Sequence, residues 1–230
     1  MNIAITTATY QRPDGGTPEY LSRALNSIKE QHHQDFKLFL IGDNYEDNDE
    51  FESLATSVLD PEKVYFENLP VAEERSIYTD YNLWCCGGVN AMNTGIQRAL
   101  EQGFDWIAHL DHDDYWKDNH LQSVNSVIDG YPDANFAFTA STHNGLTRIL
   151  PGGTNLDGQI HSRAPRACEA LHSTYCFNAK EIEIRYRDCA AEVGVAYPAD
   201  ADFLDRLNQL EHLKSYFVDE LTCFQPQEKK

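Results

Sequence analysis

Residues Trp106 to Trp116 read WIAHLDHDDYW, a mainly apolar run followed at once by an acidic one. The segment WIAHL predicts a buried strand, and the acidic run Asp111-His112-Asp113-Asp114 follows where that strand ends. Negative charge gathered in this way destabilises a fold unless a cation or hydrogen-bond donors neutralise it. The stretch therefore predicts either a metal site or a solvent-exposed acidic turn that caps the next helix.

Strands and helices alternate in the sequence before this stretch. Apolar runs predict strands at Ile3 to Tyr10, Phe36 to Ile41 and Val64 to Phe66, and helical spacing predicts helices at Tyr20 to Gln31, Phe51 to Leu59 and Val89 to Gln102. Such alternation is typical of a mainly parallel sheet, whose ligands bind beyond the carboxyl ends of the strands. Three strands bring Thr9 and Tyr10, Asp43, and the acidic run to that edge. This position favours the metal site over the acidic turn.

Several segments are harder to assign. Residues Leu69 to Trp84 mix charges and tyrosines without a period, which predicts an irregular loop. The Gly- and Pro-containing stretch from Thr147 to Arg166 predicts a mobile loop that orders over bound ligand as a lid. The remaining segments are a helix at Leu121 to Ile128, a strand at Asn135 to Thr142, an ambiguous piece at Leu171 to Phe177 and a helical pattern at Asp202 to Leu213.

Composition limits the class of protein. A length of 230 residues with 41% hydrophobic content suits one domain over 1–224, followed by a polar tail over 225–230. The net charge of −19 argues against nucleic acid or an anionic membrane as a partner. With no apolar stretch near the ~20 residues of a membrane span and no signal peptide, we expect a cytoplasmic protein without a transmembrane segment. Its six cysteines include no C-x-x-C, so they predict reduced thiols rather than a zinc ribbon.

The usual phosphate-binding motifs are missing from the sequence. It contains neither a G-x-x-x-x-G-K-[ST] loop nor a G-x-G-x-x-G turn, and windows starting at Asp43 and Asp111 both fail the EF-hand pattern. If the ligand carries a diphosphate, its binding is therefore expected to depend on a metal ion.

Five blocks of sequence carry a family resemblance. They are TTATYQR (Thr6 to Arg12), LSRALNSIKEQ (Leu21 to Gln31), FKLFLIGDN (Phe36 to Asn44), GGVNAMNTGIQRALEQG (Gly87 to Gly103) and WIAHLDHDDYW. In this order the chain resembles family 2 glycosyltransferases of the GT-A fold. The resemblance implies an α/β domain with a Rossmann-like, mainly parallel central sheet flanked by helices. About 1–116 would form the nucleotide-sugar-binding half and about 117–224 the acceptor half.

The resemblance also implies roles for single residues in donor binding. Thr9 and Asp43 would contact the nucleobase, Asp111 would hold the ribose, and Asp113 would bind the Mn²⁺ or Mg²⁺ ion that bridges the diphosphate, with Asp114 behind it. Tyr10 and Arg12 are further candidates in the first block. Asn93 matches the Asn of the family's A-R-N block, but Met92 replaces the Arg. Arg75 or Arg98 could substitute, although either is more often a solvated surface charge.

The acceptor half resembles the family through PADADFLDRL, from Pro198 to Leu207. The family's spacing aligns Asp200 with the catalytic base and Arg206 with an Arg six positions later, while Ala199 departs from the usual Glu. Asp202 is the competing candidate, and Asp200 could instead cap the following helix. His172 would lie near the acceptor pocket, although a lone His in such a segment is more often structural.

The resemblance implies transfer of a sugar, with inversion, from a nucleotide diphosphate donor, most simply a UDP-sugar, to an acceptor hydroxyl. The acceptor could be a glycan, a lipid or a protein. Two alternatives share the expected sheet: a sugar nucleotidyltransferase, and a non-catalytic module that binds a nucleotide-sugar or glycan.

Overall fold

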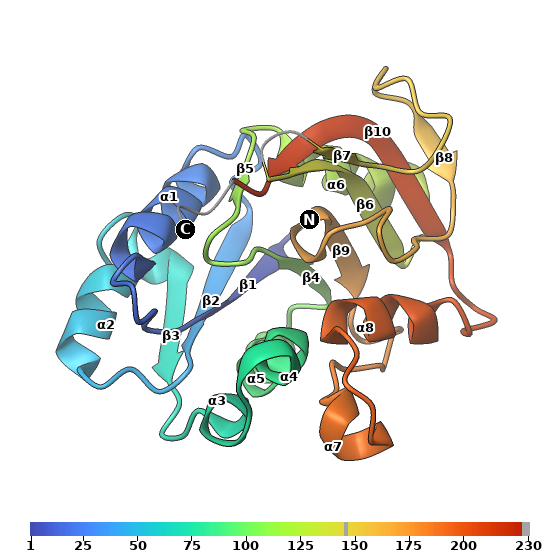
Figure 1. The fold of residues 1–230 in the computed structure, drawn as a ribbon. Coiled ribbons are helices and arrows are strands. Elements are labelled where there is room, and N and C mark those ends of the chain that lie inside the picture. The colour runs from blue at the N-terminus through green and yellow to red at the C-terminus, as the bar shows by residue number, and fades with distance from the viewer. Residues whose placement is uncertain (145–146, 227–230) are drawn as a thin grey trace.

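The computed structural model describes residues 1–144 and 147–226, and within them ten strands form one curved sheet (Figure 1). The strands are β1 (Ile3–Thr9), β2 (Phe36–Gly42), β3 (Val64–Asn68), β4 (Trp106–His109), β5 (Tyr115–Trp116), β6 (Phe136–His143), β7 (Thr147–Ile149), β8 (Ile160–Ser162), β9 (Tyr175–Asn178) and β10 (Ser215–Phe224). The helices are α1 (Thr17–Lys29), α2 (Asn48–Ala55), α3 (Glu73–Ile77), α4 (Asp80–Cys86), α5 (Val89–Glu101), α6 (His120–Gly130), α7 (Cys189–Val193) and α8 (Ala199–Leu207), with short 3₁₀ turns η1 (Pro61–Lys63) and η2 (His172–Thr174).

The strand order is β3-β2-β1-β4-β9-β6-β10-β5, with β7 beside β6 and β8 beside β10. The strands β1 to β4 are parallel to one another, and β10 is parallel to β6. Strand β9 runs antiparallel to both β4 and β6, so β6 and β10 share the direction of the first four strands. The predicted α/β fold with a mainly parallel sheet is therefore confirmed.

Both faces of the sheet are covered, because alternate side chains of each strand point to opposite faces. Ile3 and Ile5 of β1 pack in one core with apolar residues of α1, α2 and α6. Ala4, between them, packs in a second core with residues of α5 and α8.

Helix α5 lies unusually close to the sheet. A Cβ atom on Gly95 would approach Thr6 of β1 to 3.3 Å, so glycine permits this packing. At the start of α5, Gly88 has a φ of 88°, which an L side chain rarely adopts and which joins α4 to α5. The beginning of α5 is therefore held next to the carboxyl end of β1.

Some sequence predictions were wrong in detail. The stretch Leu69 to Trp84 is no irregular loop, since it contains α3 and most of α4, which are too short to show a helical period. The expected helix after Asp202 ends earlier, at Leu207. The ambiguous piece at 171–177 resolves into η2 and β9, and the long strand β10 was not predicted at all.

The predicted lid at Thr147 to Arg166 is also corrected. This segment holds β7, which pairs with β6, and β8, which pairs with β10. Between them, the Asp219 carboxylate accepts hydrogen bonds from the backbone N–H groups of Asn155 and Leu156, both at 2.9 Å. The segment is therefore bound to the sheet rather than suspended over a pocket.

The polar tail is described only in part. The Gln225 N–H donates to the Thr142 carbonyl at 2.9 Å, and residues 227–230 of the predicted tail lie outside the described residues. Across the described ranges, no helix combines the length and apolarity needed to cross a bilayer.

Candidate donor-binding site

A pocket of about 250 Å³ lies at the carboxyl ends of β1, β2 and β4. Its wall includes five residues selected from the sequence: Thr9, Tyr10, Asp43, Asp111 and Asp113. An adjoining cavity of about 610 Å³ shares Tyr10 and Asp113 with it and adds Arg12. The sheet thus brings residues more than one hundred positions apart to one edge, as parallel strands allow.

Asp43 is the most buried carboxylate in this pocket, only 4% exposed. Its Oδ2 atom accepts a hydrogen bond from Arg75 Nε at 2.8 Å, whereas its Oδ1 atom has no partner among the described residues. Burial raises the pKa of Asp43, and the charge of Arg75 opposes this rise without cancelling it. Asp43 Oδ1 is therefore a buried acceptor without a partner among the described residues, which is unfavourable.

Arg75 and Arg98 were both predicted as possible substitutes for the missing Arg or as surface charges. The Arg75 guanidinium stacks over the Tyr10 ring, 3.4 Å from the ring centroid, while also pairing with Asp43. The other proposed substitute, Arg98, instead pairs with Glu67 and Glu101 outside this pocket. Of the two arginines, only Arg75 lines the candidate pocket.

Thr9 is buried, and its hydroxyl is hydrogen-bonded to the Tyr45 hydroxyl at 2.8 Å. This contact occupies the side chain that was expected to meet the nucleobase. Thr9 lines the pocket, but its hydroxyl is bonded to Tyr45 and holds that side chain at the end of β1.

Asp111 pairs with His172, which the sequence had assigned to the acceptor side. His172 Nδ1 lies 2.7 Å from Asp111 Oδ1, and 38% of the Asp111 side chain remains exposed to the pocket. Burial alone would raise the pKa of Asp111, but the charge and hydrogen bond of His172 outweigh it, so this pKa is lowered. Burial would lower the pKa of His172, but Asp111 outweighs it, so that pKa is raised. The pair thus favours a carboxylate at position 111.

Asp113 projects where the two cavities meet. Its Oδ2 atom lies 3.7 Å from Arg12 Nη1, and its side chain is 26% exposed. The Arg23 guanidinium donates to its backbone carbonyl. Two arginines therefore hold the loop that carries Asp113 while its carboxylate faces the pocket.

Asp114 points inward and supports this loop. It is 1% exposed, and its Oδ2 atom accepts a hydrogen bond from Ser173 Oγ at 2.6 Å. Ser173 Oγ also accepts from the Asp111 N–H at 2.9 Å. Burial, followed by the charges of Asp111 and Asp113, raises the pKa of Asp114 well above its ordinary value. Ser173, which no sequence pattern singled out, thus fixes the acidic run against η2.

His112 lies in the sequence between Asp111 and Asp113, the two carboxylates that line the pocket. Its ring meets the Tyr10 ring edge-on at a centroid distance of 5.2 Å. Burial lowers the pKa of His112 to about 4, so the imidazole is neutral near pH 7 and adds no positive charge to the pocket.

These residues fit a cation that arrives together with a diphosphate. Asp113 supplies one accessible carboxylate, and Mg²⁺-like sites commonly use one or two carboxylates together with substrate phosphates. Among the described residues, one group of three closely spaced ligand atoms occurs elsewhere, at Asp157, His161 and Asp219. Because both Asp219 oxygens already accept backbone N–H groups, that group is explained as a support for the neighbouring loop.

Asn93 does not line the donor pocket, contrary to expectation. Its side-chain amide donates to the Tyr186 carbonyl at 2.8 Å and accepts from the Tyr186 N–H at 3.0 Å. Met92 lines the pocket instead. The Asn of this block therefore joins α5 to the segment that carries Tyr186.

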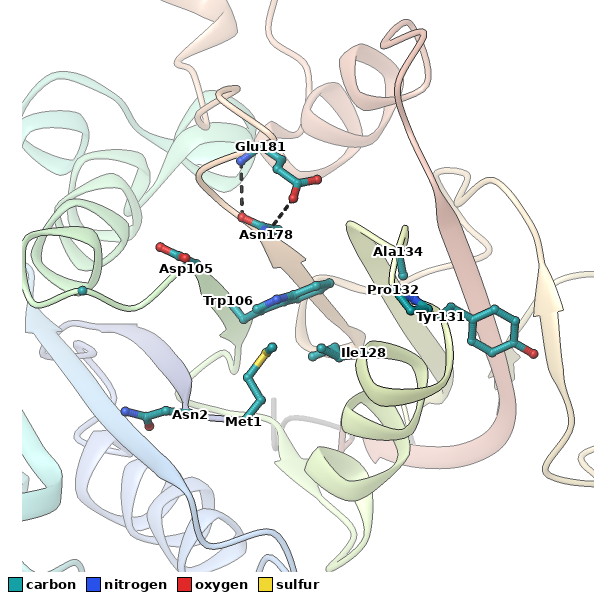
Figure 2. Close-up of a pocket in the computed structure, with 11 residues that line it drawn as sticks. Met1, Asn2, Asp105, Trp106, Ile128, Tyr131, Pro132, Ala134, Asn178 and Glu181 are labelled. Atoms are coloured by element: carbon teal, nitrogen blue, oxygen red, sulfur yellow. Dashed lines mark hydrogen bonds between the residues drawn. The ribbon is translucent and has the colours of Figure 1, made fainter.

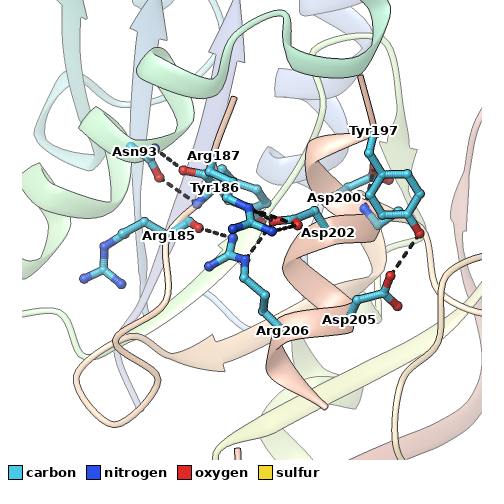
Figure 3. A network of polar contacts seen from close by, with 10 residues as sticks. Asn93, Arg185, Tyr186, Arg187, Tyr197, Asp200, Asp202, Asp205 and Arg206 are labelled. Atoms are coloured by element: carbon cyan, nitrogen blue, oxygen red, sulfur yellow. Dashed lines mark hydrogen bonds and ion pairs between the residues drawn. The ribbon is translucent and has the colours of Figure 1, made fainter. Parts of the chain in front are cut away.

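The acceptor-side carboxylates differ in their surroundings, although both lie in the first turn of α8 (Figure 3). Asp202 is 4% exposed and binds Arg187 and Arg206, with Arg206 Nε at 2.7 Å. Asp200 is half-buried and accepts from the Ala201 N–H at 2.8 Å. Asp202 and Arg206 therefore hold the helix, whereas Asp200 is not engaged in this ion-pair network.

Another cavity, of about 520 Å³, lies at the opposite edge of the sheet (Figure 2). Met1, Trp106, Ile128 and Tyr131 contribute to its wall, close to the amino ends of β1 and β4. It contains none of the candidate site residues predicted from the sequence, so it is not the candidate donor pocket.

Comparison with known proteins agrees with this geometry. No protein-family model matches the chain. An uncharacterized glycosyltransferase of Acanthamoeba polyphaga mimivirus is 33% identical over 231 residues, which cover 97% of this chain and 93% of the viral protein. The crystal structure of S. aureus TarS 1–349 in complex with UDP superimposes with a TM-score of 0.69 at 14% identity, covering 97% of this chain. Its complex with UDP-GlcNAc gives a TM-score of 0.68 at 13% identity, covering 100% of this chain.

Fold and site together define an α/β protein with a carboxylate-lined pocket at the carboxyl edge of its sheet. The similarity to the viral protein extends over nearly the whole of both chains, and on this basis the chain belongs to the glycosyltransferases. The expected activity class is thereby confirmed. The likeness to TarS shows the shared fold, and the chain spans 60% of the length of that TarS fragment.

Proposed function

We propose that the chain is a cation-dependent, inverting glycosyltransferase of family 2 and the GT-A fold, which transfers a sugar from a UDP-sugar to an acceptor hydroxyl. The observation that carries this proposal is the meeting of Asp43, Asp111 and Asp113 in one pocket. The TarS structures that share the fold contain UDP and UDP-GlcNAc, which supports a UDP-sugar as donor. We assign donor binding to about 1–116 and acceptor binding to about 117–224.

The Asp43 end of the pocket suits a pyrimidine base. The Oδ1 atom of Asp43 has no hydrogen-bond donor among the described residues, and the ring N–H of uracil would supply one. Beside it, the stacked Tyr10 and Arg75 present flat surfaces against which a base can lie. Asp43 would therefore recognise the base, and the charge of Arg75 favours the ionised form of Asp43.

The Asp113 end suits the diphosphate. Its carboxylate would hold the divalent cation, which would supply Lewis acidity toward the leaving diphosphate. Asp111, held by His172, would accept hydrogen bonds from the ribose. Asp200 would take the proton of the attacking acceptor hydroxyl, because Asp202 is already occupied by two arginines.

Release of UDP from UDP-GlcNAc and a panel of other UDP-sugars, with Mn²⁺ and with chelator, tests this function. Wild-type protein should release UDP from at least one donor only when the metal is present, and Asp200→Asn should bind UDP but release little. Binding of donors without release, with every sugar and acceptor offered, would identify a non-catalytic module. Release of pyrophosphate from UTP and a sugar phosphate would identify a nucleotidyltransferase.

A further inference from the structure

The Asp111 carboxylate is the outer end of a buried chain of hydrogen bonds. From Asp111, the chain passes through His172 Nδ1 at 2.7 Å, and His172 Nε2 lies 3.0 Å from the Tyr186 hydroxyl. The hydroxyls of Tyr186 and Tyr175 are 2.9 Å apart. Since Tyr175 is 0% and Tyr186 2% exposed, water does not compete for these contacts.

Ring packing leaves the members of this chain little freedom. The His172 ring stacks on the His109 ring at a centroid distance of 4.5 Å. The Tyr186 ring stacks on Phe203 of α8 at 4.7 Å. Stacking fixes the planes of the rings, and the hydrogen bond between His172 and Tyr186 fixes the rotation of the imidazole within its plane.

The backbone around Tyr186 is itself held from two helices (Figure 3). Asn93 of α5 bonds both the N–H and the carbonyl of Tyr186. On the side of α8, Arg206 donates to the Arg185 carbonyl and Arg187 pairs with Asp202. Residues 185–187 therefore contact the helix that begins at the donor pocket and the helix that carries Asp200.

We propose that Tyr186 is a positioning residue, which orients the Asp111 carboxylate toward the donor through His172 and does not touch the donor itself. The same three-residue segment holds α8, so Asp111 and Asp200 keep a fixed relation across the site. The part that concerns the donor rests on the proposed function. The orientation of Asp111 by His172 and Tyr186 does not.

Tyr186→Phe isolates this role, because it removes the hydroxyl and keeps the ring and both backbone bonds to Asn93. Tyr197→Phe is the matched control. It also removes a tyrosine hydroxyl, one that donates to Asp205 of α8 at 2.9 Å on the exposed side of the helix (Figure 3). Any effect that comes only from loosening α8 should occur in both variants.

The first readout is independent of any ligand. In ¹H–¹⁵N spectra of the imidazole groups, assigned with His172→Gln, the His172 signals should shift in Tyr186→Phe and stay unchanged in Tyr197→Phe. His172 signals that are identical in wild type and Tyr186→Phe would overturn the inference, whatever the protein binds.

The second readout is a double-mutant cycle on the affinity for UDP in the presence of Mn²⁺. Tyr186→Phe should weaken binding about 3- to 10-fold, the scale of one lost hydrogen bond, and Tyr197→Phe should leave it unchanged. In an Asp111→Ala background the further loss from Tyr186→Phe should be below about 2-fold, since the two residues act through one contact. Equal losses in both backgrounds would contradict the proposed route. If wild-type protein does not bind UDP, the proposed donor is wrong, and the spectra still decide the role of Tyr186.

Discussion

Replacing Asp202 with Asn should destabilise the protein strongly and leave its chemistry nearly intact. The carboxylate accepts from Arg187 Nε at 3.0 and 2.9 Å and from Arg206 Nε at 2.7 Å, with only 6% of its side chain exposed. Asn keeps the shape but removes the negative charge that both guanidinium groups face. The two arginines would then be partly buried without a counterion.

The magnitude follows from this geometry. Removing one partner of a buried ion pair costs about 3–5 kcal/mol, and the partial exposure of the arginines favours the lower end, about 3 kcal/mol. For a chain of this size that corresponds to a fall in Tm of roughly 6–12 °C. Burial works to raise the pKa of Asp202, but the arginines outweigh it and the pKa is lowered. The stabilisation is therefore present above the unfolded pKa near 3.8 and is lost as the pH falls through the lower folded value.

Thermal and denaturant unfolding of Asp202→Asn, compared with Asp205→Asn, measures this loss. Asp205 lies on the exposed side of α8, so Asp205→Asn should change the stability of the protein very little. Asp200→Asn should unfold like wild type but transfer sugar roughly 10²-fold more slowly, the scale of losing a positioned base. A structural role for Asp202 is excluded if Asp202→Asn is no less stable than Asp205→Asn, and a catalytic role for Asp200 is excluded if Asp200→Asn turns over at a near-normal rate.

Two further predictions concern the proposed donor pocket. Asp43→Ala should weaken binding of free UDP about 10-fold or more, the scale of a hydrogen bond to a charged group. The control Glu46→Ala, at an exposed position, should not weaken it. Weaker binding of the UDP-sugar together with unchanged binding of free UDP would exclude a contact between Asp43 and the base. His172 has a raised pKa because Asp111 outweighs the opposing effect of burial, so its charged form stabilises the fold below the unfolded pKa of about 6.5 and less at higher pH. The stability difference between wild type and His172→Gln should therefore be larger near pH 5.5 than near pH 8.5 in denaturant titrations, and a difference independent of pH would contradict this.

The sequence predicted best what local patterns encode. Strands β1, β2 and β4 are short apolar runs, and Asp43, Asp111 and Asp113 follow such runs directly, so a parallel sheet brings them to one edge. Strand β10 was missed because its register against β6 shifts between Val218 and Leu221, which interrupts the alternation of a regular strand.

Contacts between distant segments could not be predicted in this way. The pairing of Asp111 with His172 spans 61 positions, and the direction of the Asn93 side chain is set by Tyr186, 93 positions later. Arg75 lies in a helix of five residues, which is too short for a periodic signal. Its role became visible only when the structure placed it between Tyr10 and Asp43.

Cation-dependent donor binding at Asp113 is tested by calorimetric titration of UDP-GlcNAc and UDP into wild type, Asp113→Ala and Asp118→Ala, with Mn²⁺ and with chelator. Asp118 is a matched control, since it is an exposed carboxylate that pairs with His32 shortly after the acidic run. We expect wild type and Asp118→Ala to bind with Mn²⁺, and most of this binding to be lost in chelator and in Asp113→Ala. Equal affinity with and without the metal, or undiminished binding by Asp113→Ala, would contradict a cation-dependent donor site at Asp113.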